Sequence, residues 1–129
     1  MGILSGDGET VMVVDDTDEI RRLIRMVLHW KGYRVVEASD GEEAVELASR
    51  VRPQLILMDL SIPVMDGFEA TRRIRGMRET SHIPAVAVSD FGDSGSRQKA
   101  VEAGCVECVS KPVDFRALDG VIERHLRCH

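Results

Sequence analysis

The fold is decided by residues 55–67, LILMDLSIPVMDG. The apolar run that precedes Asp59 is typical of a strand buried on both faces inside a parallel sheet. A carboxylate at the end of such a strand costs free energy unless it is paired or holds a metal ion. Asp59 is therefore predicted to have a chemical role. The simpler interpretation of this stretch alone is a strand that ends in a solvated Asp.

The length of the chain, 129 residues, suits one domain with a single core. We expect residues 1–9 to form a flexible tail and residues 10–129 to form this domain. The formal net charge of -5 argues against a nucleic-acid surface and suits a site that collects a divalent cation. No apolar stretch is long enough for a membrane span and the start of the chain lacks a signal peptide, so a cytoplasmic location is expected.

Two residue types that often bind metals are predicted to have no such role here. Cys105 and Cys108 form a C-x-x-C within an apolar stretch, residues 105–109, that we interpret as a strand, and a separation of three places them on opposite faces. With Cys128 they make an odd number, as expected in a reducing compartment, and we interpret the pair as small buried apolar residues. Four histidines look like scattered surface residues: His29, His82, His125 and His129.

Helices are predicted between the strands from apolar residues at helical spacing. The inner face of the first helix is predicted to contain Ile20, Leu23, Ile24, Val27 and Leu28, and Gly32 to end it. Asp40 with Glu43, and Asp66 with Glu69, are predicted to form capping boxes that start the next two helices. The inner faces of the second and third helices are predicted as Ala44, Leu47, Ala48 and Val51, and as Phe68, Thr71 and Ile74.

The last two helices differ in their predicted anchorage. Only Ala100, Val101 and Ala103 are available to anchor the fourth, and the glycines around it weaken a helix, so it is predicted to be the weakest in the fold. The last helix is amphipathic through Phe115, Leu118, Ile122 and Leu126.

Strands and helices alternate along the chain, with strands predicted at residues 11–14, 34–38, 55–59, 84–88 and 105–109. This alternation predicts an α/β fold, a doubly wound parallel sheet with right-handed crossovers and helices on both faces. Such sheets bind ligands at the carboxyl ends of their strands. The polar residues that follow the strands are therefore expected to meet at one edge: Asp15, Asp16, Asp59, Ser89 and Lys111.

This set of side chains is suited to phosphoryl transfer. Three carboxylates brought together repel one another unless they share a cation, and Mg²⁺, or Mn²⁺ in its place, prefers such oxygen ligands. Lys111 can hold a phosphoryl oxygen as a point charge, and the Ser89 hydroxyl can donate to another. The natural reaction is transfer of a phosphoryl group onto Asp59.

Four motifs in this order resemble the receiver domain of two-component response regulators: Asp15-Asp16, MDLSIPVMDG around Asp59, Ser89 after an apolar strand, and Lys111-Pro112. The resemblance covers residues 10–127 and suggests a single domain like the chemotaxis regulators. It implies a flavodoxin-like five-stranded sheet of order 2-1-3-4-5 with five helices. It also implies that Asp59 accepts a phosphoryl group from a histidine kinase or a histidine phosphotransfer protein.

The resemblance also assigns the site residues. Asp16, Asp59 and the backbone carbonyl of Ser61 would bind Mg²⁺, with Asp15 contributing through water. Ser89 and Lys111 would contact the phosphoryl group, and the Lys111-Pro112 peptide bond would be cis. Phosphorylation would repack the fourth helix, fifth strand and fifth helix. That face would then signal to a downstream output protein or domain, and it offers a route to a homodimer through the fourth and fifth helices.

Two departures from the family pattern concern modulation of the site. The residue after Ser89 is usually small, but here it is Asp90, followed by Phe91. Asp90 either repels the incoming phosphate, which would slow phosphorylation or alter dephosphorylation, or it points to solvent. Cys108 stands where the family commonly has Tyr or Phe as a rotameric switch. The signal then either travels by backbone and helix shifts alone or is weak.

Three other functions compete with a phosphorylated switch. The first is a pseudo-receiver, a binding module with this fold that is never phosphorylated. The second is a haloacid-dehalogenase-like phosphatase, but its D-x-D-x-T motif does not match Asp15-Asp16-Thr17. The third is a flavodoxin, which would need a Ser/Thr/Gly-rich phosphate loop after the first strand, and no such loop follows it in this sequence. We therefore expect a switch that catalyses its own phosphorylation and dephosphorylation rather than an enzyme with turnover, and neither a nucleic acid nor a membrane as a partner.

Overall fold

The structure is a computed structural model that describes residues 9–90 and 94–127. Strands and helices alternate in these residues as β1 (Thr10–Val14), α1 (Asp18–Trp30), β2 (Arg34–Ala38), α2 (Gly41–Val51), β3 (Leu55–Asp59), α3 (Gly67–Gly76), β4 (Ala85–Ser89), α4 (Ser94–Ala103), β5 (Glu107–Ser110) and α5 (Phe115–Ile122). A π-helical turn, η1 (Glu123–Arg127), continues α5. Except for Glu9, the tail predicted for residues 1–9 lies outside the described residues.

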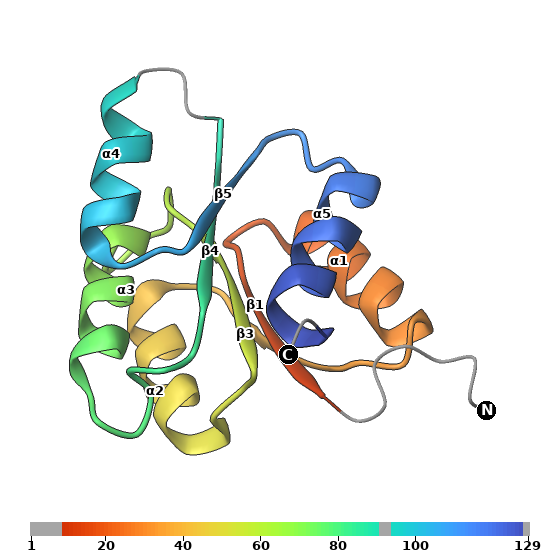
Figure 1. Cartoon of the computed structure of the whole chain (residues 1–129), viewed down its shortest axis with the longest axis horizontal. Coiled ribbons are helices and arrows are strands. Elements are labelled where there is room, and N and C mark those ends of the chain that lie inside the picture. The colour runs from red at the N-terminus through yellow and green to blue at the C-terminus, as the bar shows by residue number, and fades with distance from the viewer. Residues whose placement is uncertain (1–8, 91–93, 128–129) are drawn as a thin grey trace.

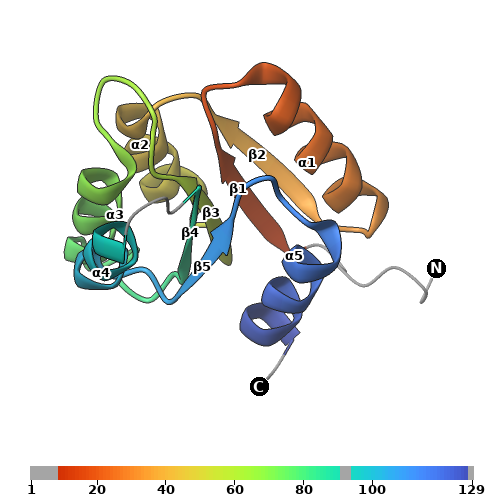
Figure 2. The same cartoon turned by 90° about the horizontal axis from the view of Figure 1, so that it is seen from above.

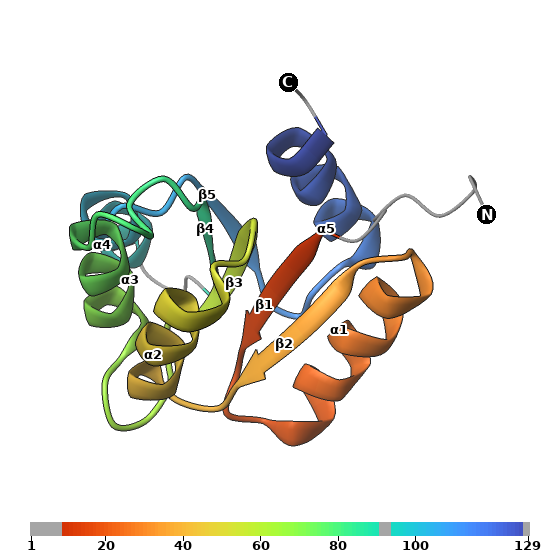
Figure 3. The ribbon, with the colours of Figure 1, turned by 90° about the horizontal axis from the view of Figure 1, so that it is seen from below.

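The five strands form one parallel sheet in the order β2-β1-β3-β4-β5, which confirms the predicted topology. Helices α1 and α5 cover one face, and α2, α3 and α4 cover the other (Figures 1 and 2). Each face has its own apolar core, with Ile24, Leu28 and Leu118 on the α1 side and Ala44, Ile74 and Ala100 on the α3 side. Strand β2 lies at the outer edge of the sheet beside α1 (Figure 3).

Helix starts follow the predicted caps. The Asp40 side chain accepts a hydrogen bond from the Glu43 backbone N–H at 2.8 Å, and Asp66 accepts one from Glu69 at 2.9 Å. In a capping box the Glu side chain also accepts a backbone N–H near the cap. Glu43 does so from the backbone N–H of Ser39, whereas Glu69 instead pairs with two arginines of its own helix. Each cap satisfies a backbone donor that the helix leaves free.

The inner faces of several helices are narrower than predicted. Ile24 and Leu28 of α1 are buried, but Ile20 is 39% and Leu23 42% exposed. Val101 of α4 is 59% exposed, and Val51 of α2 is also exposed. These predictions were wrong because apolar periodicity marks a broad arc of the helix, whereas only the residues at its centre contact the sheet.

Strand β5 begins two residues later than predicted, at Glu107. The Cys105 backbone N–H donates to the Ala100 carbonyl at 2.9 Å, so Cys105 belongs to the turn that follows α4. The prediction that Cys105 and Cys108 lie on opposite faces is also wrong, because both pack against the core beneath α2, α3 and α4. Both are free thiols, and burial raises the pKa of Cys105 to about 11, so that it stays protonated.

Within residues 9–90 and 94–127, no helix combines the length and the apolar character needed to cross a bilayer.

Candidate functional site

The predicted site residues lie together where the parallel strands end. Asp15 and Asp16 follow β1, Asp59 ends β3, Ser89 ends β4 and Lys111 follows β5. The strand register brings these ends together: Asp59 pairs with Val88, and Ser89 pairs with Ser110. Carboxylate oxygens of Asp15, Asp16 and Asp59 lie within 4.8 Å of one another. Asp15 and Asp59 are buried while Asp16 is exposed, so solvent reaches the cluster from the Asp16 side.

Both oxygens of Asp59 have a partner. Oδ1 accepts a hydrogen bond from the Ser61 backbone N–H at 3.0 Å, and Oδ2 accepts one from Lys111 Nζ at 2.9 Å. Burial raises the pKa of Asp59 above its ordinary value, although the bonds from Lys111 and Ser61 act in the opposite direction. The charge of nearby Asp15 adds to the rise. Asp59 is therefore a fixed carboxylate whose negative charge depends on the cations around it.

Lys111 is oriented by both its backbone and its side chain. Its backbone N–H donates to the Ser89 carbonyl at 2.8 Å, and the Lys111-Pro112 peptide bond is cis, as predicted. Burial opposes the charge of the ammonium group, but the bond to Asp59 and the charges of Asp15 and Asp16 raise the pKa of Lys111 overall. Lys111 thus remains a cation beside the buried carboxylate.

Asp15 is held in place by one hydrogen bond to its carboxylate and one to its backbone carbonyl. Its Oδ1 accepts the Thr17 backbone N–H at 2.8 Å, which forms a tight turn before α1. Its carbonyl accepts a hydrogen bond from the Arg21 guanidinium at 2.8 Å, and Arg21 also binds Asp18 and Glu37. We did not predict Arg21 as part of the site, because the contact depends on how α1 and β2 pack together.

A second feature missing from the predictions is the close packing around Gly67. A Cβ atom at this position would lie 2.5 Å from the Asp59 carbonyl oxygen and 2.7 Å from the Leu60 Cα. The absence of a side chain therefore lets α3 start directly against the end of β3. The Asp66-Gly67 step carried this signal, but we interpreted it only as a helix start.

The three residues predicted to modulate the site, Asp90, Cys108 and Phe91, lie in different surroundings or outside the described residues. Asp90 is exposed directly after the buried Ser89. Cys108 is half-buried against the core, at the place where an aromatic switch was expected. Phe91 lies outside the described residues.

The donor set fits a hard divalent cation. Three carboxylates, two of them buried, provide oxygen ligands without sulfur or imidazole, which is the chemistry that Mg²⁺ prefers. The Ser61 carbonyl as a further ligand stays a prediction.

Comparison with known proteins defines the class. Residues 11–123 match the model of the response regulator receiver domain, and the chain belongs to this family. It is a receiver domain of a two-component response regulator with the flavodoxin-like fold.

Among individual relatives, the chain is 33% identical to the polar-differentiation response regulator DivK of Brucella anthropi, over 92% of this chain and 96% of that protein. It also resembles the receiver domain of the sensor histidine kinase PA1611 of Pseudomonas aeruginosa, at 33% identity and a TM-score of 0.85 over 92% of this chain and 97% of that one. That domain was solved with a magnesium ion in its active-site cleft. A third similar structure is the receiver domain of the Saccharomyces cerevisiae regulator Ssk1, in complex with the histidine phosphotransfer protein Ypd1. It is 26% identical, with a TM-score of 0.85, over 92% of this chain and 89% of that one.

Proposed function

We propose that Asp59 is the phosphoacceptor of this receiver domain. The observation that carries the proposal is a buried carboxylate bonded to Lys111 and within 4.8 Å of two other carboxylates. Burying like charges together costs stability, and this cost is understandable if the cluster serves a reaction in which a cation and a phosphoryl group enter. A pseudo-receiver without the reaction would have no need for the full set.

Asp15, Asp16, Asp59 and the Ser61 carbonyl would hold Mg²⁺ or Mn²⁺. The magnesium ion in the PA1611 receiver supports this choice. When bound, such an ion neutralises charge on the phosphoryl oxygens and on the carboxylates. Asp16, which is exposed, provides the open side by which the ion and the donor enter.

In the transfer itself, a carboxylate oxygen of Asp59 attacks phosphorus, and an O–P bond forms. The N–P bond of a phosphohistidine breaks, and its electron pair stays with the histidine nitrogen. Lys111 Nζ, which already contacts Asp59 Oδ2, would donate to a phosphoryl oxygen, and the Ser89 hydroxyl would donate to another. Hydrolysis of the resulting acyl phosphate would reset the switch.

The phosphodonor would be a histidine kinase or a histidine phosphotransfer protein. The complex of the Ssk1 receiver with Ypd1 supports the second class, because it shows a similar domain bound to such a protein. The output would pass through α4, β5 and α5 to a downstream protein or domain, or through a homodimer formed by α4 and α5. Because Cys108 replaces the expected aromatic residue, we propose that backbone and helix shifts carry this signal.

The proposal is tested by whole-protein mass spectrometry after incubation with acetyl phosphate and Mg²⁺. Wild type is expected to gain the mass of one phosphoryl group, whereas Asp59→Asn gains none because an amide is a poor nucleophile. Chelation of the metal should also remove the gain. An unmodified wild type would support a pseudo-receiver, and an equal gain in Asp59→Asn would place the phosphoryl group elsewhere.

Asp90→Ala is expected to phosphorylate faster than wild type, by roughly two- to fivefold, because removal of one charge next to the pocket lowers repulsion of the incoming anion. The rates of acetyl phosphate uptake at low and high salt measure this effect, since screening weakens it. Equal rates at low salt would show that Asp90 faces solvent without consequence.

A further inference from the structure

A hollow of about 230 Å³ lies at the end of the sheet opposite to Asp59. Its lining comes from the residue before β1, the loops before β3 and β4, and the π-helical turn η1. Gln54 in this lining directly precedes β3, and Asp59 ends that strand, so the two residues lie about 16 Å apart along it. The hollow is therefore separate from the phosphorylation pocket.

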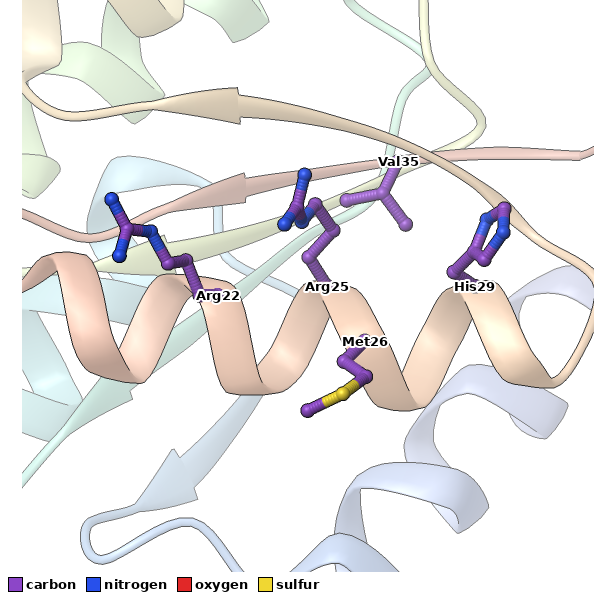
Figure 4. A pocket seen from close by; sticks show the side chains of 5 residues that line it. All are labelled: Arg22, Arg25, Met26, His29 and Val35. Atoms are coloured by element: carbon purple, nitrogen blue, oxygen red, sulfur yellow. The ribbon is translucent and has the colours of Figure 1, made fainter.

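A second and larger hollow, of about 570 Å³, is built differently. Four of its five lining side chains come from α1 alone, and Arg25 among them is paired with Glu37 at 3.3 Å (Figure 4). The smaller hollow instead joins segments that are far apart in the sequence, and buried Pro53, Ile83 and Leu126 provide its apolar part. Apolar walls with a few convergent polar groups are typical of a site for a small molecule.

The polar lining of the smaller hollow offers hydrogen-bond donors. Gln54 Oε1 already accepts the Thr10 backbone N–H at 2.7 Å, so the NH₂ group of Gln54 is left for another partner. Within residues 9–90 and 94–127, neither the Arg52 guanidinium nor the His82 imidazole has an ion-pair or hydrogen-bond partner. These three side chains can therefore donate to a ligand without breaking an existing bond.

His125 enters the same hollow from η1. Its Nε2 lies 2.8 Å from Glu107 Oε1, and Arg124 also donates to the Glu107 carboxylate. A carboxylate on one ring nitrogen fixes the imidazole and leaves the other nitrogen, Nδ1, for a ligand. π-Helices are rare, and they occur frequently at functional sites.

The backbone of Arg52 adopts a conformation that its residue type disfavours. Arg52 follows α2 with a φ of 53°, in the left-handed region where glycine or asparagine is usual. Pro53 disfavours a helical conformation of the residue before it, which explains why the chain turns here. The turn does not explain an arginine, so the guanidinium is the feature of this position that needs a role.

An anion suits the hollow better than a metal ion. Glu9, His82 and His125 are possible metal ligands, but in the described part of the chain only the carboxylate cluster of the phosphorylation site brings three ligand atoms within 4.8 Å of one another. The planar donor fork of an arginine matches a carboxylate. The volume lies below the roughly 300 Å³ at which sites for drug-sized ligands begin, so the anion is small.

We propose that this hollow binds a small organic anion, with its carboxylate on Arg52 and Gln54 and a short apolar chain against Ile83 and Leu126. The two histidines provide further donors to the carboxylate. Glu9 alone is acidic among the described lining residues, and its charge opposes the anion. Binding requires neither a metal ion nor phosphorylation of Asp59, because those groups act at the other end of the sheet.

The test is an NMR titration of the full chain at fixed pH and ionic strength, without Mg²⁺, in which the imidazole Cε1–H signals are followed. Butyrate is expected to shift the His82 and His125 signals saturably and to leave that of His29, on α1, unchanged. Acetate is expected to bind about tenfold more weakly, because it lacks two of the buried methylene groups. The neutral 1-butanol and the cationic butylammonium are expected to shift none of the three signals. Butanol that binds as tightly as butyrate, or inorganic phosphate that binds more tightly, would overturn the class of ligand.

Variants separate the role of the guanidinium from a structural one. Arg52→Asn removes the guanidinium but suits the left-handed backbone, so butyrate should bind at least tenfold more weakly while the denaturation midpoint stays at or above the wild-type value. Arg50→Gln, on α2 outside the hollow, is the matched control and should leave the affinity unchanged. Glu9→Gln should tighten binding at least twofold. All three variants are expected to take up acetyl phosphate at the wild-type rate. Equal affinities of wild type and Arg52→Asn, or weaker binding by Glu9→Gln, would overturn the proposal.

Discussion

Gly41→Ala is expected to destabilise the protein by about 3 kcal/mol or more, beyond the usual range for an overpacked position, because the new methyl group meets backbone atoms. A Cβ atom at Gly41 would lie 1.9 Å from the carbonyl oxygen of Met65 and 2.8 Å from its carbonyl carbon. Either the start of α2 or the loop between β3 and α3 must move. That loop contains Ser61, so the rate of phosphorylation should fall together with stability. Chemical denaturation and acetyl phosphate uptake measure the two effects.

Gly76→Ala is the matched control for this substitution. Gly76 is the last residue of α3, and apart from its chain neighbours and the backbone of its own helix, no described heavy atom would lie within 4 Å of a Cβ atom there. Alanine should therefore stabilise the protein by about 0.5–1 kcal/mol through its better helix propensity and the smaller entropy of the unfolded chain. If both variants unfold at the wild-type denaturant concentration, the tight contact between α2 and the Met65 carbonyl does not exist in solution.

Lys111→Ala is expected to slow phosphorylation by roughly 100- to 1,000-fold, which is the usual effect of removing one hydrogen-bond donor to the negative charge that develops in a transition state. It should also change the pH dependence. Lys111 lowers the pKa of Asp59 against the rise caused by burial, so its removal lets that pKa rise further. Since only the ionised carboxylate attacks phosphorus, the loss of rate on acidification should begin at a higher pH in the variant. Rates of acetyl phosphate uptake across a pH series measure both effects.

Lys31→Ala is the control for Lys111→Ala, because it also removes one positive charge but leaves the phosphorylation pocket intact. Lys31 and Lys111 side chains have the same exposed fraction, 34%, and each forms an ion pair at 2.9 Å, with Asp119 and Asp59 respectively. Lys31 lies at the end of α1, away from the pocket, so its removal should leave the pH profile unchanged. Equal effects of the two substitutions would show that net charge, and not the contact with Asp59, sets the rate.

The sheet could be predicted because its central strands are short apolar runs that end at polar residues. β3 runs to Asp59 as expected, and the alternation of strands and helices predicts a parallel sheet, whereas the strand order was implied by the resemblance to receiver domains. The ends of elements were harder to predict, because a few backbone hydrogen bonds at a helix terminus decide them. Cys105 and Cys108 looked like parts of one strand, but the backbone of Cys105 binds the end of α4.

The site could be predicted because each of its polar side chains directly follows a strand, and parallel strands bring their carboxyl ends together. The residues that hold the site could not be predicted in the same way. The bond from Arg21 to the Asp15 carbonyl and the close contacts at Gly41 and Gly67 depend on how the elements pack against one another, which the spacing of apolar residues does not show. The exposure of Leu23 was missed because periodicity shows that a residue lies on an apolar arc without showing what covers it.

The most direct measurement locates the phosphoryl group by its chemistry. Borohydride reduces an aspartyl phosphate to homoserine, so wild-type protein treated with acetyl phosphate and Mg²⁺ is reduced, digested and sequenced by tandem mass spectrometry. We expect homoserine at position 59, and none when the metal is chelated. Homoserine at Asp15, Asp16 or any other carboxylate, with Asp59 unchanged, would contradict the assignment of Asp59 as the phosphoacceptor.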